Sequence, residues 1–188
     1  VELNTPFLPD LKTLAAEILE ATGADFTLRA EAVTDVDWLQ QVHRDFPPIS
    51  LGRFFVYGSH YDGAIPKDKI NLNIDAATAF GSGEHETTKA CLMALELLHD
   101  KPCAKALDMG CGSGILALAI KKLWPQADIL AVDIDPESVR VTKRHAEMNG
   151  ADVTAIAGDG YAAKEVGAAP VYDLITANIL AGPLIAMA

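Results

Sequence analysis

The chain has 188 residues, of which 50% are hydrophobic, and a mean hydropathy of +0.18, which suits a globular protein with one full core and a smaller additional part. Its formal net charge of -11 and isoelectric point near 4.7 argue against general binding to nucleic acid, which needs clustered Lys and Arg to neutralise phosphates. The three cysteines form no Cys-x-x-Cys pair and no apolar run approaches the length of a membrane span, so we expect a cytoplasmic protein without disulfides, a zinc site or a membrane partner.

The N-terminal part of the sequence predicts one helix and one strand. Asp10 precedes an amphipathic helix, and Gly23 ends it. Residues 26–32 then alternate in character, as in a half-buried strand. Since one helix and one strand cannot form a domain, we interpret residues 1–33 as the remnant of a small α+β module whose first part is missing from this sequence.

Residues 34–69 have the features of a connector. A short helix is predicted around Trp38, and the consecutive prolines Pro47 and Pro48 interrupt the chain after it. An apolar strand follows at residues 54–57, and turn-forming residues come next. We therefore expect this stretch to join the N-terminal module to a larger domain.

From residue 70 onward, predicted strands and helices alternate regularly. The strands are nearly continuous in apolar residues, which is typical of strands covered on both faces. Such an alternation predicts an α/β fold, a doubly wound parallel sheet, over residues 70–188. The predicted strands are 70–74, 106–108, 129–132, 153–156 and 171–177, and the predicted helices are 86–98, 113–123 and 136–149.

A glycine-rich turn, residues 108–114, follows the second of these strands. In doubly wound sheets, ligands bind beyond the carboxyl ends of the strands, and glycines let the backbone approach the ligand closely. The dinucleotide pattern G-x-G-x-x-G/A fails in the register that begins at Gly110 but is met in the register that begins at Gly112. The pattern alone therefore leaves open which nucleoside cofactor the loop binds.

Two acidic residues bear on this choice. Asp108, expected at the mouth of the loop, would repel a pyrophosphate and attract the ammonium and sulfonium cations of S-adenosylmethionine, so it favours the methyl donor. Asp133 ends the next strand, 23 residues after Gly110, where a carboxylate accepts hydrogen bonds from ribose hydroxyls. This second feature fits either ligand, and both residues have the alternative role of turn residues or helix caps.

Two further polar features are expected near the same crevice. Asn178 ends the last predicted strand, and its amide can orient the cofactor's amino-acid end or a substrate amine; the alternative is a cap on the next helix. Residues 79–88 place two glycines beside an aromatic residue, which suggests backbone folded over a ligand, with the Thr87 and Thr88 hydroxyls available; the alternative is a plain turn with a Thr cap. His85 lacks a second ligand at recognisable spacing, so no metal site is predicted.

Taken together, these motifs resemble the methyltransferases that modify protein eleven of the large ribosomal subunit. The glycine loop alone would indicate only a class I methyltransferase. The segment from Phe80 to Thr88 and the run from Asn178 to Pro183 are much more specific, although Ser82 and Glu86 stand where the family often has Thr and Pro. The resemblance covers about residues 38–184.

The resemblance implies a class I methyltransferase domain with a Rossmann-like doubly wound sheet, joined by the connector to a module that recruits the ribosomal protein. It implies S-adenosylmethionine as the cofactor and methylation of lysine side chains and the N-terminal amine of that protein. Because such a sheet needs further strands after Asn178, we expect the domain at 70–188 to be truncated at its C-terminus. The residues expected to contact the cofactor are Thr88, Asp108, Gly110, Gly112, Asp133 and Asn178.

Methyl transfer to an amine requires a neutral nitrogen aligned with the methyl group. No residue stands out as a general base, so positioning and desolvation are our hypothesis, with Asn178 as the candidate catalytic orienting group. Two alternatives remain from the residues: a dinucleotide-dependent oxidoreductase that uses the Gly112 register, and a noncatalytic cofactor-binding fragment.

Overall fold

A computed structural model describes residues 10–24, 27–29, 47–75, 86–168 and 171–187. The chain separates into two compact units, residues 1–41 and 42–188. Helix α1 (Leu11–Thr22) belongs to the first unit, and the sheets belong to the second.

Helix α1 begins and ends where the sequence predicts. The Asp10 carboxylate accepts hydrogen bonds from the Lys12 N–H at 3.1 Å and the Thr13 hydroxyl at 2.8 Å, and so caps the helix. Gly23 ends it with a φ of 70°, a conformation that favours glycine. Of the strand predicted at 26–32, residues 27–29 form no strand, and the rest lies outside the described residues, as does the helix predicted around Trp38.

A small sheet precedes the main domain. It contains β1 (Ile49–Leu51), β2 (Phe54–Tyr57) and β3 (Ile70–Asn73). Strand β1 is antiparallel to β2, and β2 is parallel to β3. We expected the strand after residue 69 to join the parallel sheet that follows, but this was wrong, because its backbone pairs with β2 instead. The sequence predicts that a strand forms here, but the packing of the whole chain decides which strand it pairs with.

The main sheet contains four parallel strands and confirms the α/β, doubly wound fold. They are β4 (Lys105–Met109), β5 (Asp128–Asp133), β6 (Thr154–Ala157) and β7 (Leu174–Ala177), in the spatial order β6-β5-β4-β7. The chain moves outward from β4 to β6 and then returns to pair β7 with the other side of β4. The strand order therefore reverses at β4, which places the ligand-binding crevice at its carboxyl end.

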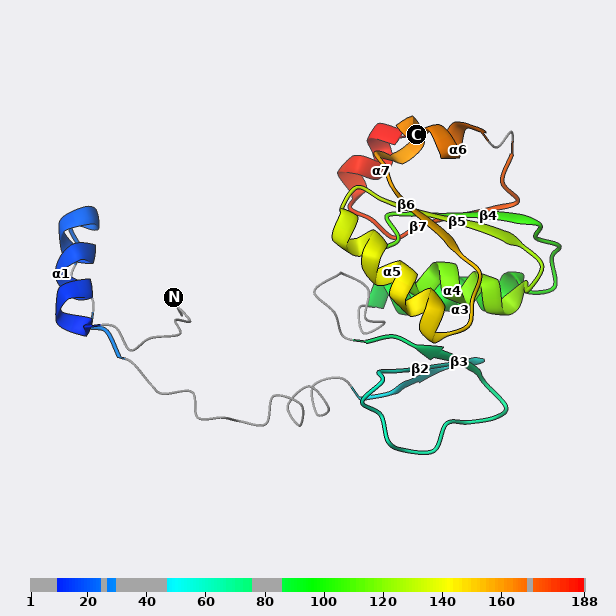
Figure 1. The fold of residues 1–188 in the computed structure, drawn as a ribbon, viewed down its shortest axis with the longest axis horizontal. Coiled ribbons are helices and arrows are strands. Elements are labelled where there is room, and N and C mark those ends of the chain that lie inside the picture. Colours follow the sequence, from blue (N-terminus) through cyan, green and yellow to red (C-terminus); the bar gives the residue numbers. More distant parts are fainter. Residues whose placement is uncertain (1–9, 25–26, 30–46, 76–85, 169–170, 188) are drawn as a thin grey trace. The chain divides into compact units, whose positions relative to one another are not determined.

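Helices cover both faces of this sheet (Figure 1). Helices α3 (Glu86–Leu98), α4 (Ile115–Leu123) and α5 (Pro136–Met148) lie on one face, and α6 (Lys164–Ala168) lies on the other. Alternate strand residues separate the two cores: Ala106 and Ile129 pack with α4 and α5, whereas Leu107 and Val132 pack with α6. A 3-10 turn, η1 (Gly160–Ala162), and a last helix, α7 (Ala181–Met187), complete the described elements.

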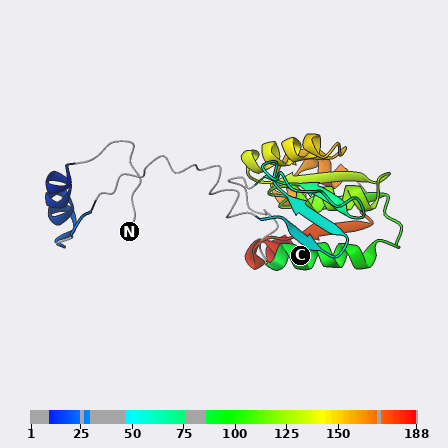
Figure 2. The same ribbon diagram turned by 90° about the horizontal axis from the view of Figure 1, so that it is seen from below.

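The small sheet packs on the helical layer. Phe54 of β2 and Leu72 of β3 are fully buried, in the same apolar cluster as Leu118 and Ile120 of α4. Figures 1 and 2 show this sheet on the side of α3 and α4 that faces away from the parallel sheet. The end of β3 is therefore held beside α4 and α5, next to the glycine loop that precedes α4.

Candidate functional site

The glycine loop has a conformation that only glycine adopts easily. Gly110, Gly112 and Gly114 have φ values of 69°, 54° and 80°. The Gly110 and Cys111 N–H groups donate to the Val132 carbonyl at 2.7 and 3.0 Å, which folds the loop over the end of β5. A Cβ atom at Gly110 would lie 2.2 Å from Ile179 Cγ2, so the loop and the segment after β7 are in close contact.

Asp133 lies beside this loop, as its position at the end of β5 predicts. Its carboxylate accepts hydrogen bonds from the Gly112 N–H at 2.8 Å and the Asp135 N–H at 3.0 Å. The side chain is only partly buried, and a carboxylate has about four lone-pair positions, so it retains capacity to accept from ligand hydroxyls.

Asp108 does not lie at the mouth of the loop, as we expected, but inside the domain, where it is 1% exposed. Its carboxylate accepts hydrogen bonds from the Ala117 N–H of α4 at 3.1 Å and from the Thr176 hydroxyl of β7 at 2.7 Å. Burial raises the pKa of this carboxyl to about 6, although both hydrogen bonds lower it. The expected position of Asp108 at the mouth of the loop is therefore wrong, because α4 and β7 enclose the side chain, whereas its expected contact with the cofactor stays a prediction.

Thr88 and Asn178 meet at the same end of the sheet. Asn178, which follows β7, donates from Nδ2 to the Thr88 hydroxyl in the first turns of α3 at 3.0 Å. Thr88 is fully buried, so this hydrogen bond fixes the position of the Asn178 amide. Ile179, the next residue, contacts Gly110, so the Asn178 amide and the glycine loop border one crevice.

Sequence reasoning missed the part that α5 takes in this site. Thr142 donates from its hydroxyl to the Gly112 carbonyl at 3.0 Å, and His145 Nδ1 lies 2.8 Å from the Ser113 carbonyl oxygen. His145 is only 1% exposed. Its helical spacing from Val139 and Thr142 places it on the buried face of α5, a signal that the sequence already contained.

A third acidic residue follows the next strand of the sheet. Asp159 is the second residue after β6, at the carboxyl edge, and the neighbouring Gly158 N–H donates to the Asp133 carbonyl at 2.9 Å. Its signal was an acidic residue three positions after the strand predicted at 153–156, whereas Asp133 came directly after its predicted strand. We add Asp159 to the polar groups at this edge.

The site also contains a cysteine, Cys111, which is buried in the glycine loop. Burial raises the pKa of the Cys111 thiol to about 12, so a thiolate nucleophile is disfavoured at neutral pH. Among the described residues, no group of His, Cys, Asp and Glu side chains could hold a metal ion. His85 and the rest of segment 79–85 lie outside the described residues.

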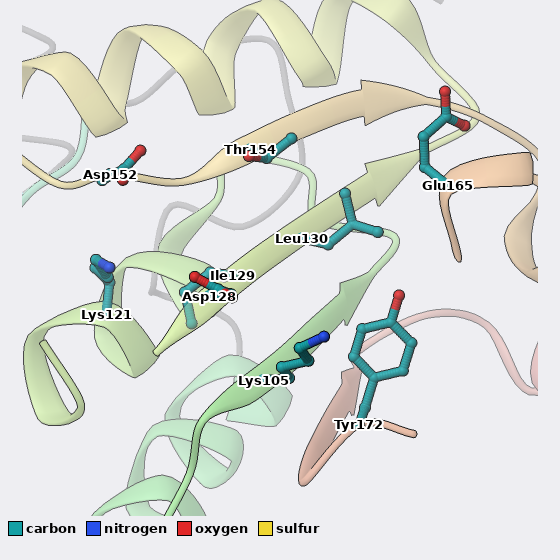
Figure 3. Close-up of a pocket in the computed structure, with 9 residues that line it drawn as sticks. All are labelled: Lys105, Lys121, Asp128, Ile129, Leu130, Asp152, Thr154, Glu165 and Tyr172. Carbon is teal, nitrogen blue, oxygen red and sulfur yellow. The ribbon is translucent and has the colours of Figure 1, made fainter. Parts of the chain in front are cut away.

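A cavity of about 240 Å³ lies at the opposite end of the sheet (Figure 3). Lys105, Asp128 and Thr154, which line it, are the first residues of β4, β5 and β6. Glu165 and Tyr172 close its other side. Because ligands of doubly wound sheets bind at the carboxyl ends of the strands, this cavity is separate from the candidate cofactor site.

Three features define the fold of the class I methyltransferases in this chain. They are the strand order β6-β5-β4-β7, the glycine loop after β4 and Asp133 at the end of β5. The model of the family described as ribosomal protein L11 methyltransferase (PrmA) matches residues 6–188, and the chain belongs to this family. Among the described residues, no helix is long and apolar enough to cross a membrane.

Individual relatives agree with this assignment. The chain is 42% identical over 175 residues to the ribosomal protein L11 methyltransferase of Caulobacter sp. strain K31, covering 92% of this chain and 60% of that protein. It is 39% identical over 189 residues to the enzyme of the same name from Rhodopseudomonas palustris strain BisB5, covering 98% and 64%. The crystal structure of the ribosomal protein L11 methylase of Lactobacillus delbrueckii subsp. bulgaricus has 33% identity and a TM-score of 0.64, covering 74% of this chain and 70% of that one. The chain thus spans 60% to 64% of the length of these curated relatives.

Proposed function

We propose that the chain acts in S-adenosylmethionine-dependent methylation of large-subunit ribosomal protein L11, at lysine side chains and the N-terminal amine. The observation that carries the proposal is the Asn178–Thr88 hydrogen bond beside the glycine loop. It joins the two motifs that are most specific to the family, 90 residues apart in sequence, at the crevice where a cofactor binds in this fold.

The residues present fit S-adenosylmethionine. The backbone at Gly112 has no side chain to hinder a nucleoside, whereas the bare Gly110 makes room for Ile179, and Asp133 would accept from ribose hydroxyls. Thr88 would hold the amino-acid end, Asn178 would contact either that end or the substrate amine, and Asp108 would act from beneath the loop through its charge. When bound, the cofactor supplies the sulfonium methyl group.

The chain's own contribution to transfer is positioning and desolvation. A lysine with a pKa of about 10.4 is mostly protonated at neutral pH, and removal of water from the crevice lowers that pKa. With Nδ2 directed at Thr88, the Asn178 Oδ1 is the acceptor that an incoming amine N–H would meet. Asn178 is therefore our candidate for the group that aligns the nitrogen lone pair.

The charge of the chain is consistent with a ribosomal protein as substrate. A net charge of -11 attracts a basic partner and disfavours direct binding to RNA. The three cysteines are free thiols, which suits the cytoplasm, where we place the protein. Residues 1–33 are proposed to belong to the module that recruits the substrate, and 34–69 to the connector.

Two measurements test this function. Calorimetric titration with S-adenosylhomocysteine and, separately, with NAD should give binding of the first only; binding of NAD alone would support the oxidoreductase. Incubation with methyl-labelled S-adenosylmethionine and purified L11 should label L11. Cofactor binding without any transfer to L11 would instead support a noncatalytic fragment.

A further inference from the structure

His145 is buried in α5 with both ring nitrogens in contact with backbone groups. Nδ1 lies 2.8 Å from the Ser113 carbonyl oxygen, in the glycine loop. Nε2 lies 3.1 Å from the backbone nitrogen of Asp75, directly beyond β3. The side chain thus bridges two segments that are far apart in the sequence and border the candidate cofactor site.

These two partners determine the protonation state of the ring. The Asp75 N–H can only donate, so Nε2 must carry a lone pair and no proton. The Ser113 carbonyl can only accept, so Nδ1 must carry the proton. The geometry therefore requires neutral imidazole in the Nδ1–H tautomer.

The neighbours of His145 on α5 hold the same two segments. Asn149, one turn later, accepts from the Asn73 N–H and donates to the Asn73 carbonyl, both at 2.8 Å. Arg144 pairs with the Asp75 carboxylate at 3.0 Å. Thr142, one turn earlier, donates to the Gly112 carbonyl. Helix α5 therefore fixes the end of β3 and the glycine loop relative to each other. Of the four side chains, only that of His145 contacts both segments.

We propose that His145 is a positioning residue for the cofactor site, whose neutral ring links the glycine loop to the end of β3 and whose protonation breaks this link and weakens cofactor binding. This inference rests on the proposed function, because it assigns the glycine loop to a cofactor. His145 lies outside the family motifs, so the proposal adds a new residue to those that shape the candidate cofactor site.

Protonation breaks the link because it places a second N–H against the Asp75 N–H. Burial lowers the pKa of His145, while the Ser113 hydrogen bond and the Asp75 charge raise it and the Arg144 charge lowers it. The ring is therefore neutral at neutral pH and becomes charged below the ordinary histidine range. Asp108, with a pKa of about 6, titrates in the same range, so the experiment must separate the two groups.

The test is the pH dependence of S-adenosylhomocysteine binding, measured by calorimetry on the wild type and on His145→Gln, which cannot titrate. Between about pH 7.5 and pH 5.5 we expect wild-type affinity to fall by less than about tenfold, because the pKa of the His145 ring lies below the ordinary histidine value, and the fall to be much smaller in His145→Gln. Any remaining pH dependence in the variant belongs to Asp108. His145→Phe should bind more weakly at both pH values, because it removes the acceptor for the Asp75 N–H and the hydrogen bond to the Ser113 carbonyl.

His99→Gln is the matched control, since His99 ends α3 in contact with Glu96 and Asp100, outside the candidate site. It should keep the wild-type pH profile. Circular dichroism at each pH identifies any variant that unfolds. NMR of protein labelled with ¹⁵N-histidine should show one Nδ1–H tautomer near neutral pH that is absent from His145→Gln.

Three results would overturn the inference. Equal pH profiles for the wild type and His145→Gln would show that the ring does not control binding. An Nε2–H tautomer for His145 would contradict the link itself. Absence of S-adenosylhomocysteine binding to the wild type at every pH would refute the proposed function and, with it, this role, whereas binding with equal profiles refutes only the role of His145.

Discussion

Individual residues at the candidate site act mainly through the backbone of the glycine loop. Asp133 and Thr142 hold the N–H and the carbonyl of Gly112, and His145 holds the carbonyl of Ser113. Each of these side chains satisfies a backbone group that would otherwise lose its hydrogen bond on burial. The shape of the loop therefore depends on side chains from β5 and α5 as much as on its glycines.

Gly110→Ala tests the close contact between the loop and the segment after β7. The new Cβ would stand 2.2 Å from Ile179 and at a positive φ, so we expect a loss of about 2–4 kcal/mol of unfolding free energy. Urea denaturation measures this loss, and cofactor binding should weaken with it. The control is Gly150→Ala, which has a φ of 56° but no atom within 4 Å and should lose only about 1 kcal/mol. Equal losses at the two glycines would show that the Ile179 contact is unimportant.

Asn178→Ala separates two possible roles of this amide. If Asn178 aligns the substrate amine, kcat for L11 methylation should fall at least about tenfold while S-adenosylhomocysteine affinity changes little. Thr88→Val should reproduce part of this effect, because it removes the hydroxyl that orients the amide, and Thr88→Ser should not. Nearly unchanged transfer with weakened cofactor binding would assign Asn178 to the cofactor instead.

Asp108→Asn tests the buried carboxyl through its pH dependence. Because the pKa of the folded form, about 6, exceeds the ordinary value of 3.8, the folded chain holds the proton more tightly, and Asp108 makes the protein less stable as pH rises from about 4 to 6. This change is on the order of 3 kcal/mol. As the pH rises over this range, the wild type should therefore lose unfolding free energy relative to Asp108→Asn. A difference independent of pH would show that Asp108 titrates normally.

At the scale of elements, local patterns predicted the four strands of the parallel sheet and helices α3, α4 and α5, but not the short helices α6 and α7. Helix α3 has the predicted bounds, since its amphipathic spacing is a property of the segment alone. Strand β7 begins later than predicted, at Leu174, because Asp173 turns its carboxylate to the N–H groups of Ala104 and Lys105 at 2.8 and 2.9 Å. An apolar run shows where a strand is favoured, but pairing with the neighbouring strand decides where it starts.

Asn149→Ala tests how α5 holds the end of β3. The variant loses the paired hydrogen bonds to Asn73, and we expect about 1–3 kcal/mol lower stability with faster hydrogen exchange at the Asn73 amide. The control is Glu147→Ala, an exposed position on the same helix, which should leave that exchange rate unchanged. Unchanged protection of Asn73 in Asn149→Ala would show that these two hydrogen bonds do not hold the end of β3.

At the scale of the larger unit, residues 42–188, strand β7 and the segment that follows it carry exposed apolar side chains. Ile175 of β7 is 45% exposed, and Leu180 and Ile185 are 79% and 75% exposed. Strand β7 also forms one edge of the described sheet, and an apolar sheet edge favours association.

We therefore expect the 188-residue chain to self-associate at high concentration. The double variant Leu180→Ser and Ile185→Ser should lower the weighted-average mass in sedimentation velocity. The control is Leu97→Ser, because Leu97 is 84% exposed and lies on α3, away from β7 and the segment that follows it. A monomer at all concentrations, or equal association of both variants, would contradict the prediction.

Local residue chemistry by itself determined the α/β class, the glycine loop and the family motifs, because periodicity, turn residues and short motifs are properties of contiguous segments. Only the tertiary structure decided that β3 pairs with β2, that Asp108 points inward, and that Asn178 meets Thr88. It also turned His145 from an unremarked histidine into a bridge between two segments. Each of these depends on which distant groups share a buried space, and burial and hydrogen-bond pairing are decided only when the chain is packed.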